Sequence, residues 1–387
     1  MTTSVKPTIG HSGRSRELRE LATLFLRLGT TAFGGPAAHL AIMREQVVSR
    51  RQWLSDQEFL DLISACNLIP GPNSTEMAIH IGHRRAGWPG LLTAGVCFIL
   101  PAAVMVTGIA WAYTKFGSLP AMQGVLVGVK PVVVVIVLQA LVVLKRSALK
   151  SRWLQTLAFL AALLSLVGVY ELTVLFGVAA AAVVVQQGRN WPRRIRALAP
   201  IPLFALASDS PAASVALGKL FLVMAKVGSV LFGSGYVLLA FLQSELVEQR
   251  HWITAGQLLD AVAVGQVTPG PVFTTATFLG YLMAGPRGAA VATVGIFFPA
   301  FAFVALTAPL LARLRGSAPL GVFLDGLNAA SLGLIAAVTV QIGRTAFVNL
   351  PTMFIAAVAA LLLFRFRVSS TWLVLGGAVA GWLISVF

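Results

Sequence analysis

Charged side chains are scarce in this sequence. Only 11% of its 387 residues are charged, while 57% are hydrophobic, and an average soluble domain carries about 25% charged residues. The chain therefore has too few charges to cover a surface that faces water. We predict an all-α, polytopic integral membrane protein, because apolar stretches long enough for membrane helices, about 20 residues each, recur from residue 21 to residue 387.

Acidic residues are the scarcest charged type. Thirteen Asp and Glu stand against 29 Lys and Arg, which gives a formal net charge of +16. A nucleic-acid partner is not expected, because the basic residues form short clusters between apolar segments, at 145–152 and 189–196, without interleaved aromatic residues. This distribution is typical of cytoplasmic loops under the positive-inside rule.

Cysteine is nearly absent as well. The only two, Cys66 and Cys97, lie in apolar surroundings, so a disulfide framework and a Cys-x-x-Cys zinc site are both excluded. We interpret them as small buried side chains. Residues 1–20 are polar and basic and contain no signal-peptide cleavage pattern, which favours a retained first helix over a signal peptide.

The motifs of enzymes and ATP-driven pumps are also missing. There is no Gly-x-x-x-x-Gly-Lys-Ser/Thr loop, and Gly233-Ser234-Gly235 is too short for a dinucleotide fingerprint. His80 and His83 lie three residues apart but belong to no His-Glu-x-x-His motif. We therefore expect no enzymatic activity, no cofactor and no bound metal.

An internal repeat is present. At a shift of 199 residues, uncommon residue types coincide, among them Gly29 with Gly228, Trp53 with Trp252, and Pro70-Gly71-Pro72 with Pro269-Gly270-Pro271. A shift of 198 aligns later pairs such as Gly82 with Gly280, Pro101 with Pro299, and Arg146 with Arg344. Shared hydrophobicity does not place so many uncommon residues in register, so the chain is predicted to be a duplicated helical bundle.

The repeat predicts the domain organisation. We expect a polar basic tail at residues 1–17, a first transmembrane domain at 18–187, a linker at 188–212 and a second domain at 213–387. The apolar segments, 10–13 transmembrane or re-entrant in all, are 18–43, 57–82, 87–113, 121–144, 152–169, 171–187, 213–242, 257–284, 287–312, 321–343, 349–364 and 370–387. Positive clusters follow different segments in the two halves, which favours inverted topology. Inversion requires one of the first six segments not to cross.

Two of these segments contain Pro-Gly-Pro, which interrupts a helix because proline lacks an amide donor. A helix that restarts there exposes unpaired amides and a partial positive charge, which favours an anion. Simple kinks are the alternative. The candidate anion-binding residues are Pro70, Gly71, Pro72, Asn73, Ser74 and Thr75 in the first copy, and Pro269, Gly270, Pro271, Thr274 and Thr275 in the second.

Three charged residues within apolar segments are further candidates. Lys226 and its repeat counterpart Arg27 are interpreted as cations that hold the anion, with extension of the long side chain to the membrane interface as the alternative. Glu76, whose counterpart is Thr275, is interpreted as a proton-coupling residue, or else as a helix cap. Asp61 and Asp260 are expected to pair with Arg50, Arg51 or Arg250, or to serve transport.

The stretches FGGPAAHLAIMREQVV and RRQWLSDQEFLDLISACNLIPGPNSTEMAIHIGHRRAGWPG, with their second copies, resemble the chromate ion transporter (CHR) family in its long, two-domain form. The resemblance covers nearly the whole chain and implies efflux of chromate across the bacterial inner membrane, chromate resistance, antiparallel halves and coupling to protons. It adds Gly34, Gly35 and Gly233 to the substrate-binding candidates, although the second copy reads Phe-Gly-Ser-Gly where the first reads Phe-Gly-Gly-Pro.

The partners that follow are chromate, its chemical analogue sulfate, protons and the lipid bilayer, and a homodimer is compatible with them. Two other functions remain open at this point. One is a permease that carries sulfate or another oxyanion inward, and the other is an anion channel. A chromate reductase is disfavoured, because flavin, haem and nicotinamide signatures are lacking.

Overall fold

The computed structural model describes residues 11–33, 35–187, 216–232, 235–307 and 318–386. The predicted linker 188–212, its arginine cluster, most of the tail at 1–17, Gly34 and Gly233 lie wholly or largely outside these ranges. The first half contains α1 (His11–Thr31), α2 (Gly35–Arg44), η1 (Glu45–Arg50), α3 (Asp56–Cys66), α4 (Asn73–Phe116), α5 (Pro120–Ala148), α6 (Arg152–Leu166) and α7 (Glu171–Gln187). The second half contains α8 (Leu217–Val230), α9 (Val237–Leu242), η2 (Gln243–Gln249), α10 (Ala255–Val267), η3 (Val272–Thr274), α11 (Thr275–Thr307), α13 (Ala318–Ala346), α14 (Leu350–Arg365) and α15 (Ser370–Val386).

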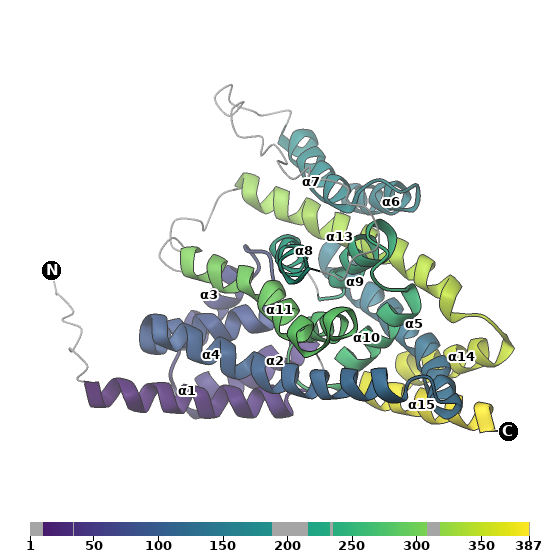
Figure 1. Ribbon diagram of the computed structural model, residues 1–387. Coiled ribbons are helices and arrows are strands. Elements are labelled where there is room, and N and C mark those ends of the chain that lie inside the picture. Colours follow the sequence, from purple (N-terminus) through teal and green to yellow (C-terminus); the bar gives the residue numbers. More distant parts are fainter. Residues whose placement is uncertain (1–10, 34, 188–215, 233–234, 308–317, 387) are drawn as a thin grey trace.

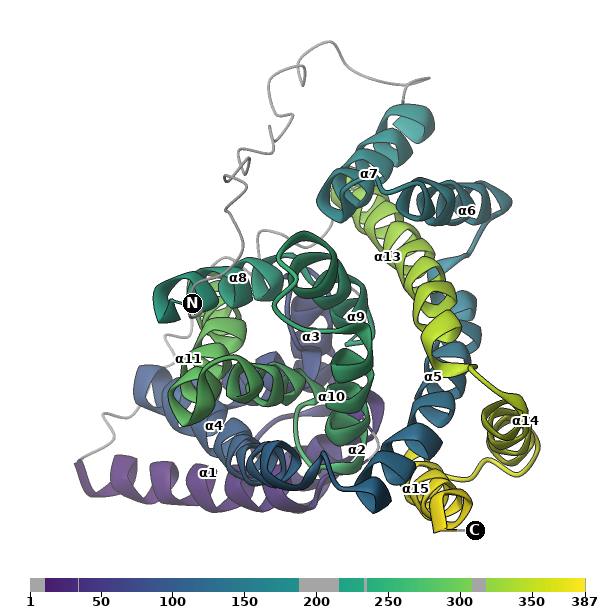
Figure 2. The same ribbon diagram turned by 45° about the vertical axis from the view of Figure 1, so that its right-hand side comes forward.

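The helices form two adjoining groups. In Figure 2, α1–α4 and α8–α11 form one bundle, and α5 and α13 run along its side with α6 and α7 at one end and α14 and α15 at the other. In Figure 1 the two long helices α4 and α11 lie within the first bundle, where they contact each other. The described residues are helical or irregular and include no β-strand, as the all-α prediction requires.

The repeat is visible in local backbone structure. Each half has a short π-helix, η1 or η2, and a residue with positive φ two positions after its end, Gln52 at 52° or His251 at 51°. Each half then begins its next helix with a capping box, formed by Ser55 in the first half and Thr254 in the second. A capping box satisfies two orphan backbone amides reciprocally, so the same local chemistry starts α3 and α10.

Both α4 and α11 are helical hairpins rather than straight helices. Their backbones leave helical geometry at Ala86-Gly87 and at Ala284-Gly285, and the two glycines have φ of 63° and 61°. The two arms of α4 pack so closely that a Cβ added to Gly82 would lie 2.2 Å from the carbonyl oxygen of Gly90. The second hairpin repeats this contact at Gly280, with 2.3 Å to the equivalent oxygen. Glycine is therefore required at these positions for steric reasons.

The outer helices pack across the repeats. Helices α6 and α7 of the first half lie against α13 of the second, while α14 and α15 of the second half lie against α5 of the first. Small residues allow the close approach: Gly128 of α5 meets Gly377 and Gly381 of α15, and its counterpart Gly326 of α13 meets Ala179 of α7. Small residues are the usual means by which membrane helices approach closely. Each half is therefore completed by helices of the other.

Two predicted segments are wrong as single helices. The expected helix at 18–43 is divided into α1 and α2, and the expected helix at 213–242 is divided into α8 and α9. Both breaks fall at the Phe-Gly-Gly-Pro or Phe-Gly-Ser-Gly motif. In the first of them Gly35 has a positive φ of 76°, which an α-helix does not accommodate. The local backbone preference of glycine outweighs the continuous hydrophobicity there.

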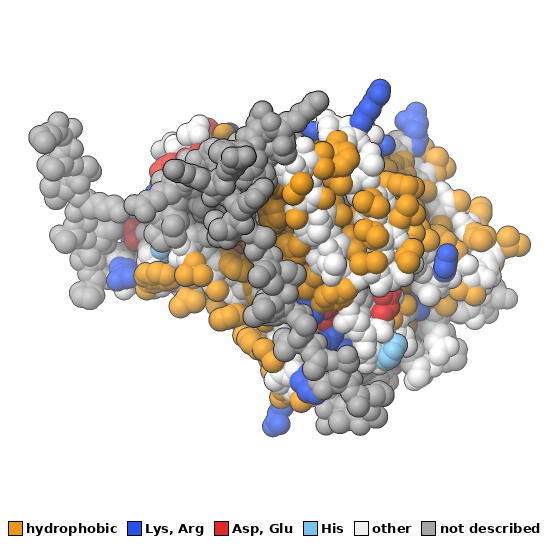
Figure 3. Space-filling view, turned by 90° about the horizontal axis from the view of Figure 1, so that it is seen from above, with side chains coloured by type: hydrophobic (Ala, Val, Ile, Leu, Met, Phe, Trp, Pro, Cys, Tyr) orange, Lys and Arg blue, Asp and Glu red, His pale blue; other side chains and the backbone are white. Residues whose placement is uncertain are grey.

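The described part of the chain contains four helices long and apolar enough to span a membrane, Asn73–Phe116, Met122–Arg146, Val272–Thr307 and Gly321–Ala346, and four shorter apolar helices. Many large apolar side chains on the outer helices are exposed, including Phe159, Val185, Phe354 and Trp372. Figure 3 shows apolar side chains spread over much of one face, with few charges between them. A water-soluble monomer rarely exposes such an area, so lipid is the fitting environment.

Candidate functional site

A cavity of about 440 Å³ lies where the two repeats meet. The first repeat contributes the segment after α3, the first residue of α4 and the C-terminal end of α5, and the second repeat contributes α9 and α13. Its lining residues are Cys66, Asn67, Leu68, Ile69, Asn73, Leu144, Ala148, Lys150, Val237, Gly321, Leu324, Asp325, Asn328, Ser331, Leu332 and Ile335. This size is within the usual range for sites that bind small molecules.

The polar groups of this cavity come from both repeats. Asn73 donates its side-chain amide to Asn67 over 3.1 Å, which places two amide groups beside the start of α4. Elsewhere in the lining, Lys150 and Asp325 form an ion pair of 2.9 Å, and Asn328 adds another amide. Amides and a lysine supply hydrogen-bond donors. The cavity can therefore bind a polar, anionic ligand.

The two Pro-Gly-Pro loops are held by reciprocal bonds between the repeats. Gly71 donates its backbone N–H to the carbonyl oxygen of Leu231 over 2.7 Å, and Gly270 donates to the carbonyl oxygen of Ala32 over 3.0 Å. Leu231 and Ala32 are themselves counterparts at the 199-residue shift. Each loop is thus bonded to the end of the first helix of the other half, an arrangement with approximate two-fold symmetry.

The helices restart differently after the two loops. In the first repeat α4 begins at Asn73, immediately after Pro72, whereas in the second a 3₁₀ turn precedes α11. The hydroxyls of Thr274 and Thr275 donate to backbone carbonyl oxygens of their own turn, each over 2.8 Å. In the first repeat Thr75 is fully buried and its hydroxyl has no partner among the described residues.

Ser74 is also buried, with 3% of its surface exposed. Asn73 is the residue that this α4 N-terminus contributes to the cavity lining. The first loop therefore places both a polar side chain and the start of a helix at the cavity. The counterpart of Asn73 in the second repeat is Val272, which is apolar.

Glu76 is fully buried, and neither carboxylate oxygen has a hydrogen-bond partner in the described part of the structure. It lies directly against the Pro-Gly-Pro loop, because a Cβ on Gly71 would come within 2.2 Å of its Oε1 atom. The alternative interpretation as a helix cap is not supported, because neither carboxylate oxygen accepts a hydrogen bond from the first turn of α4. A buried acid without a partner is costly as an anion, which makes a neutral, protonated state accessible.

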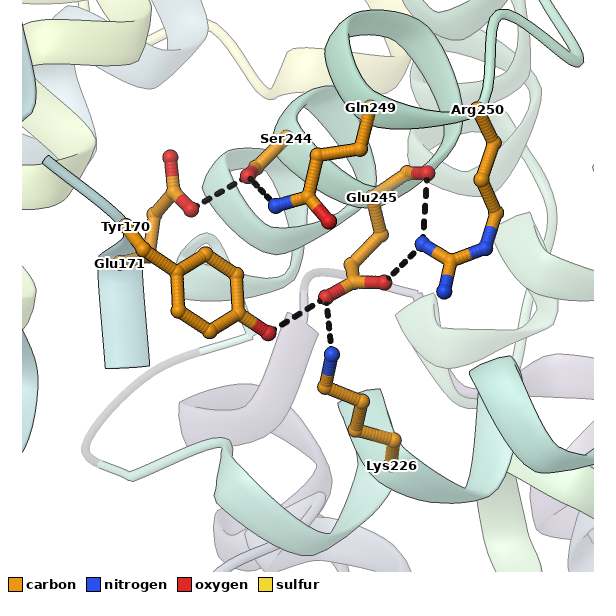
Figure 4. Close-up of polar contacts among 7 residues, drawn as sticks. All are labelled: Tyr170, Glu171, Lys226, Ser244, Glu245, Gln249 and Arg250. Carbon is orange, nitrogen blue, oxygen red and sulfur yellow. Dashed lines mark hydrogen bonds and ion pairs between the residues drawn. The ribbon is translucent and has the colours of Figure 1, made fainter. Parts of the chain in front are cut away.

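The two predicted cations have different surroundings. Arg27 is exposed on α1, whereas Lys226 on α8 lies in a polar cluster shown in Figure 4. There Lys226 donates to the carboxylate of Glu245 over 2.6 Å and lies 5.0 Å from the ring centre of Tyr170. The Lys226 charge is therefore engaged within the protein in this conformation.

The aspartates differ from expectation. Asp260 pairs with Lys130, with 3.8 Å between Nζ and Oδ1, and accepts a hydrogen bond of 2.9 Å from Tyr113. The predicted pairing of Asp260 with Arg250 is wrong, because Arg250 bonds to Glu245 instead. Asp61 accepts a hydrogen bond of 3.1 Å from Gln57. Lys130 occupies the repeat position of Asn328, so a residue that lines the cavity in the second repeat corresponds to one member of an ion pair in the first.

Several residues of these sites were not singled out in the sequence: Asn67, Lys130, Lys150, Tyr170, Glu245, Asp325, Asn328 and Ser331. A signal did exist for Lys130, Asp325 and Asn328, since each is a polar residue within a predicted apolar segment. No comparable signal marked Tyr170 or Lys150, which lie at the ends of helices, where polar residues are ordinary.

These features define a multi-pass helical membrane protein whose two repeats meet around a polar cavity. The chain belongs to the chromate transporter family, whose sequence model matches residues 19–185 and 218–382. The two matched segments together contain both Pro-Gly-Pro loops.

Relatives from several bacteria agree with this membership. A chromate transport protein of Cupriavidus metallidurans is 34% identical over 96% of this chain and 94% of its own length. A probable chromate transport protein of Synechococcus elongatus is 32% identical over 90% of both chains. A chromate transport protein of Pseudomonas aeruginosa is 30% identical over 94% of this chain and 92% of its own. No solved structure matches this chain.

Proposed function

We propose that this chain is a secondary transporter that exports chromate across the bacterial inner membrane and thereby confers chromate resistance. The observation that carries the proposal is that the two repeats of a chromate transporter family member meet at a polar cavity beside a broken helix. The proton motive force would drive export. Sulfate, which has the same shape and charge as dianionic chromate, would be a second ligand.

The anion would bind where α4 begins. A helix N-terminus carries unpaired amides and a partial positive charge that favour an oxyanion, and Asn73 adds a side-chain amide that lines the cavity. Ser74 and Thr75 follow on the same turn. The second loop, at Pro269, Gly270 and Pro271, would act through backbone amides, because the hydroxyls of its threonines are already used by their own turn.

Arg27 and Lys226 would supply positive charge to the transport path, and Gly34, Gly35 and Gly233 would let the backbone approach the anion closely. For Arg27, exposure on α1 supports the role, because an exposed guanidinium can reach a passing oxyanion. Substitution of Arg27 by alanine should then abolish chromate uptake into everted vesicles while the protein remains in the membrane.

Glu76 would couple transport to protons. Its carboxylate has no partner, lies against the first Pro-Gly-Pro loop and has a threonine as its repeat counterpart. A change in the charge of Glu76 therefore acts directly on the loop that begins α4. Protonation would remove a negative charge from the neighbourhood of the anion, and deprotonation would favour its release.

We propose inverted topology for the two repeats. The first arm of α4, from Asn73 to the break at Ala86, reaches about 20 Å at 1.5 Å per residue. This is short of a hydrocarbon core of about 30 Å. A re-entrant segment that includes this arm and α3 would leave an odd number of crossings in the first repeat, as inversion requires.

The test is chromate flux into everted membrane vesicles from cells that express the protein. Uptake that saturates, requires an imposed proton gradient and stops when a protonophore is added is the expected result. Flux that is independent of the proton gradient and does not saturate would indicate a channel instead. Counterflow of sulfate and chromate in proteoliposomes would identify an inward sulfate permease if sulfate were strongly preferred.

A further inference from the structure

The carboxylate of Glu245 lies at the centre of three hydrogen-bond donors, one from the end of its own π-helix and two from distant segments of the chain. Lys226 of α8 and the hydroxyl of Tyr170 both donate to its Oε1 atom, over 2.6 and 2.8 Å, and Arg250 bonds to its Oε2 atom. Figure 4 shows the three donors converging on this one side chain. Glu245 is 1% exposed. Two cations and a phenol thus bond to both oxygens of one carboxylate, and the same donors suit the oxygens of another anion.

The counterpart of Glu245 in the first repeat shows that the local fold does not need a charge there. That counterpart is Gln46, in the equivalent π-helix, and it accepts a hydrogen bond of 2.7 Å from Arg51. Arg51 and Arg250 each also lie over the tryptophan two residues later, at 5.5 and 5.6 Å from the ring centres. A neutral amide thus performs the same structural task in one repeat that a carboxylate performs in the other.

Other acidic groups near the cluster are bonded elsewhere. Glu171, at the start of α7, accepts a hydrogen bond from the hydroxyl of Ser244. Glu248, on the same π-helix as Glu245, accepts one from Gln243 over 3.2 Å and is exposed. If the side chain of Glu245 moved away, Lys226 and Arg250 would lose their bonded carboxylate, and two partly buried cations would remain.

We propose that Lys226, Arg250 and Tyr170 form an oxyanion-binding site that the side chain of Glu245 occupies in this conformation. The inference rests on the proposed function and adds a second site for the transported dianion, because none of these side chains lines the cavity beside α4. Chromate would displace Glu245, since a tetrahedral dianion offers four oxygens and twice the charge of a carboxylate to the same donors. The side chains of Lys226 and Arg250 are 20% and 25% exposed, so both donors reach the surface of the protein.

Displacement makes chromate and Glu245 compete for the same donors. The freed Glu245 loses both cationic partners in a buried environment, where an unpaired charge is strongly disfavoured. The carboxylate therefore returns to the donors when chromate is released. Glu171 is unaffected, because its bond is to Ser244 and not to the cations.

The first experiment measures chromate binding to the purified protein by equilibrium dialysis, on the alkaline side of neutrality, where chromate is a dianion. Glu245→Gln should bind about tenfold more tightly than the natural protein, because a neutral amide competes less well than a carboxylate for charged donors. Lys226→Ala should bind at least about tenfold more weakly. Glu171→Gln, the matched control, should bind as the natural protein does. Unchanged or weaker binding by a folded Glu245→Gln protein overturns the proposal.

A second measurement needs no change at Glu245. Tyr170→Phe removes one donor of the site and should weaken chromate binding about threefold. Binding equal to that of the natural protein by both Tyr170→Phe and Lys226→Ala overturns the proposal, even if Glu245→Gln fails to fold. Failure of the proposed function itself is separate, because it would appear as absent chromate flux in vesicles of the natural protein.

Discussion

The backbone amide of Gly71 donates to the carbonyl oxygen of Leu231, which joins the Pro-Gly-Pro loop of one repeat to the first helix of the other over 2.7 Å. Gly270 and Ala32 repeat this bond in the opposite sense. The broken helices are therefore positioned by contacts between the repeats. Any movement of one repeat against the other moves both loops.

Gly71 should not tolerate a side chain. Its φ of 145° is a backbone conformation that residues other than glycine rarely adopt. An added Cβ would also lie 2.2 Å from Oε1 of Glu76. Gly71→Ala should lower the free energy of unfolding by about 1–3 kcal/mol and should impair transport, as judged by thermal unfolding in detergent and by vesicle flux. Gly108→Ala is the control, because that position is open and within a helix. Equal stability of the two variants would contradict this account.

The variant Glu76→Gln should keep its folded stability but lose the coupling of transport to protons. Because both oxygens of Glu76 lack hydrogen-bond partners, a neutral group of the same shape removes a burial cost and should keep or raise the unfolding temperature. Chromate accumulation driven by a proton gradient should be lost. Vesicle flux with and without a protonophore measures this, with the exposed Glu45→Gln as control. Full protonophore-sensitive accumulation by Glu76→Gln would exclude the coupling role.

Lys150 should matter for the substrate and little for stability. Its ion pair with Asp325 joins side chains that are 62% and 37% exposed, and exposed pairs contribute about 0–1 kcal/mol. Lys150→Ala should therefore leave the unfolding temperature nearly unchanged but raise the KM for chromate, because it removes a cation from the cavity wall. Lys145→Ala, which removes an exposed lysine outside the cavity lining, should leave KM unchanged. Identical KM values in both variants would place the substrate path elsewhere.

Lys130 should stabilise the protein through Asp260, which is only 3% exposed. Lys130→Ala leaves this buried carboxylate with Tyr113 as its remaining donor and should cost about 1–3 kcal/mol. The double substitution of Lys130 and Asp260 by alanine should cost less than the sum of the single changes, because the unpaired charge is gone. Thermal unfolding of the four proteins in detergent gives this coupling energy. Strict additivity would show that the pair does not interact.

Much of this protein follows from its sequence, because the relevant physics is local or compositional. A chain so poor in charge can be stable only in lipid, and the register of the two copies is visible in their prolines, glycines and tryptophans. The break at Pro70-Gly71-Pro72 follows from the missing amides and the backbone freedom of these residue types. Continuous hydrophobicity misled the prediction at 18–43, where Gly35 with positive φ lies at the break between α1 and α2.

The sites depended on packing between residues far apart in the chain. The sequence around Lys226 does not predict that Glu245 and Tyr170 lie beside its ammonium group. Nor does any local pattern place Asn73, Lys150 and Asp325 in the lining of one cavity. These relationships arise because the outer helices of each repeat pack on the other repeat, and helix packing is set by the shapes of whole surfaces rather than by local residue preference.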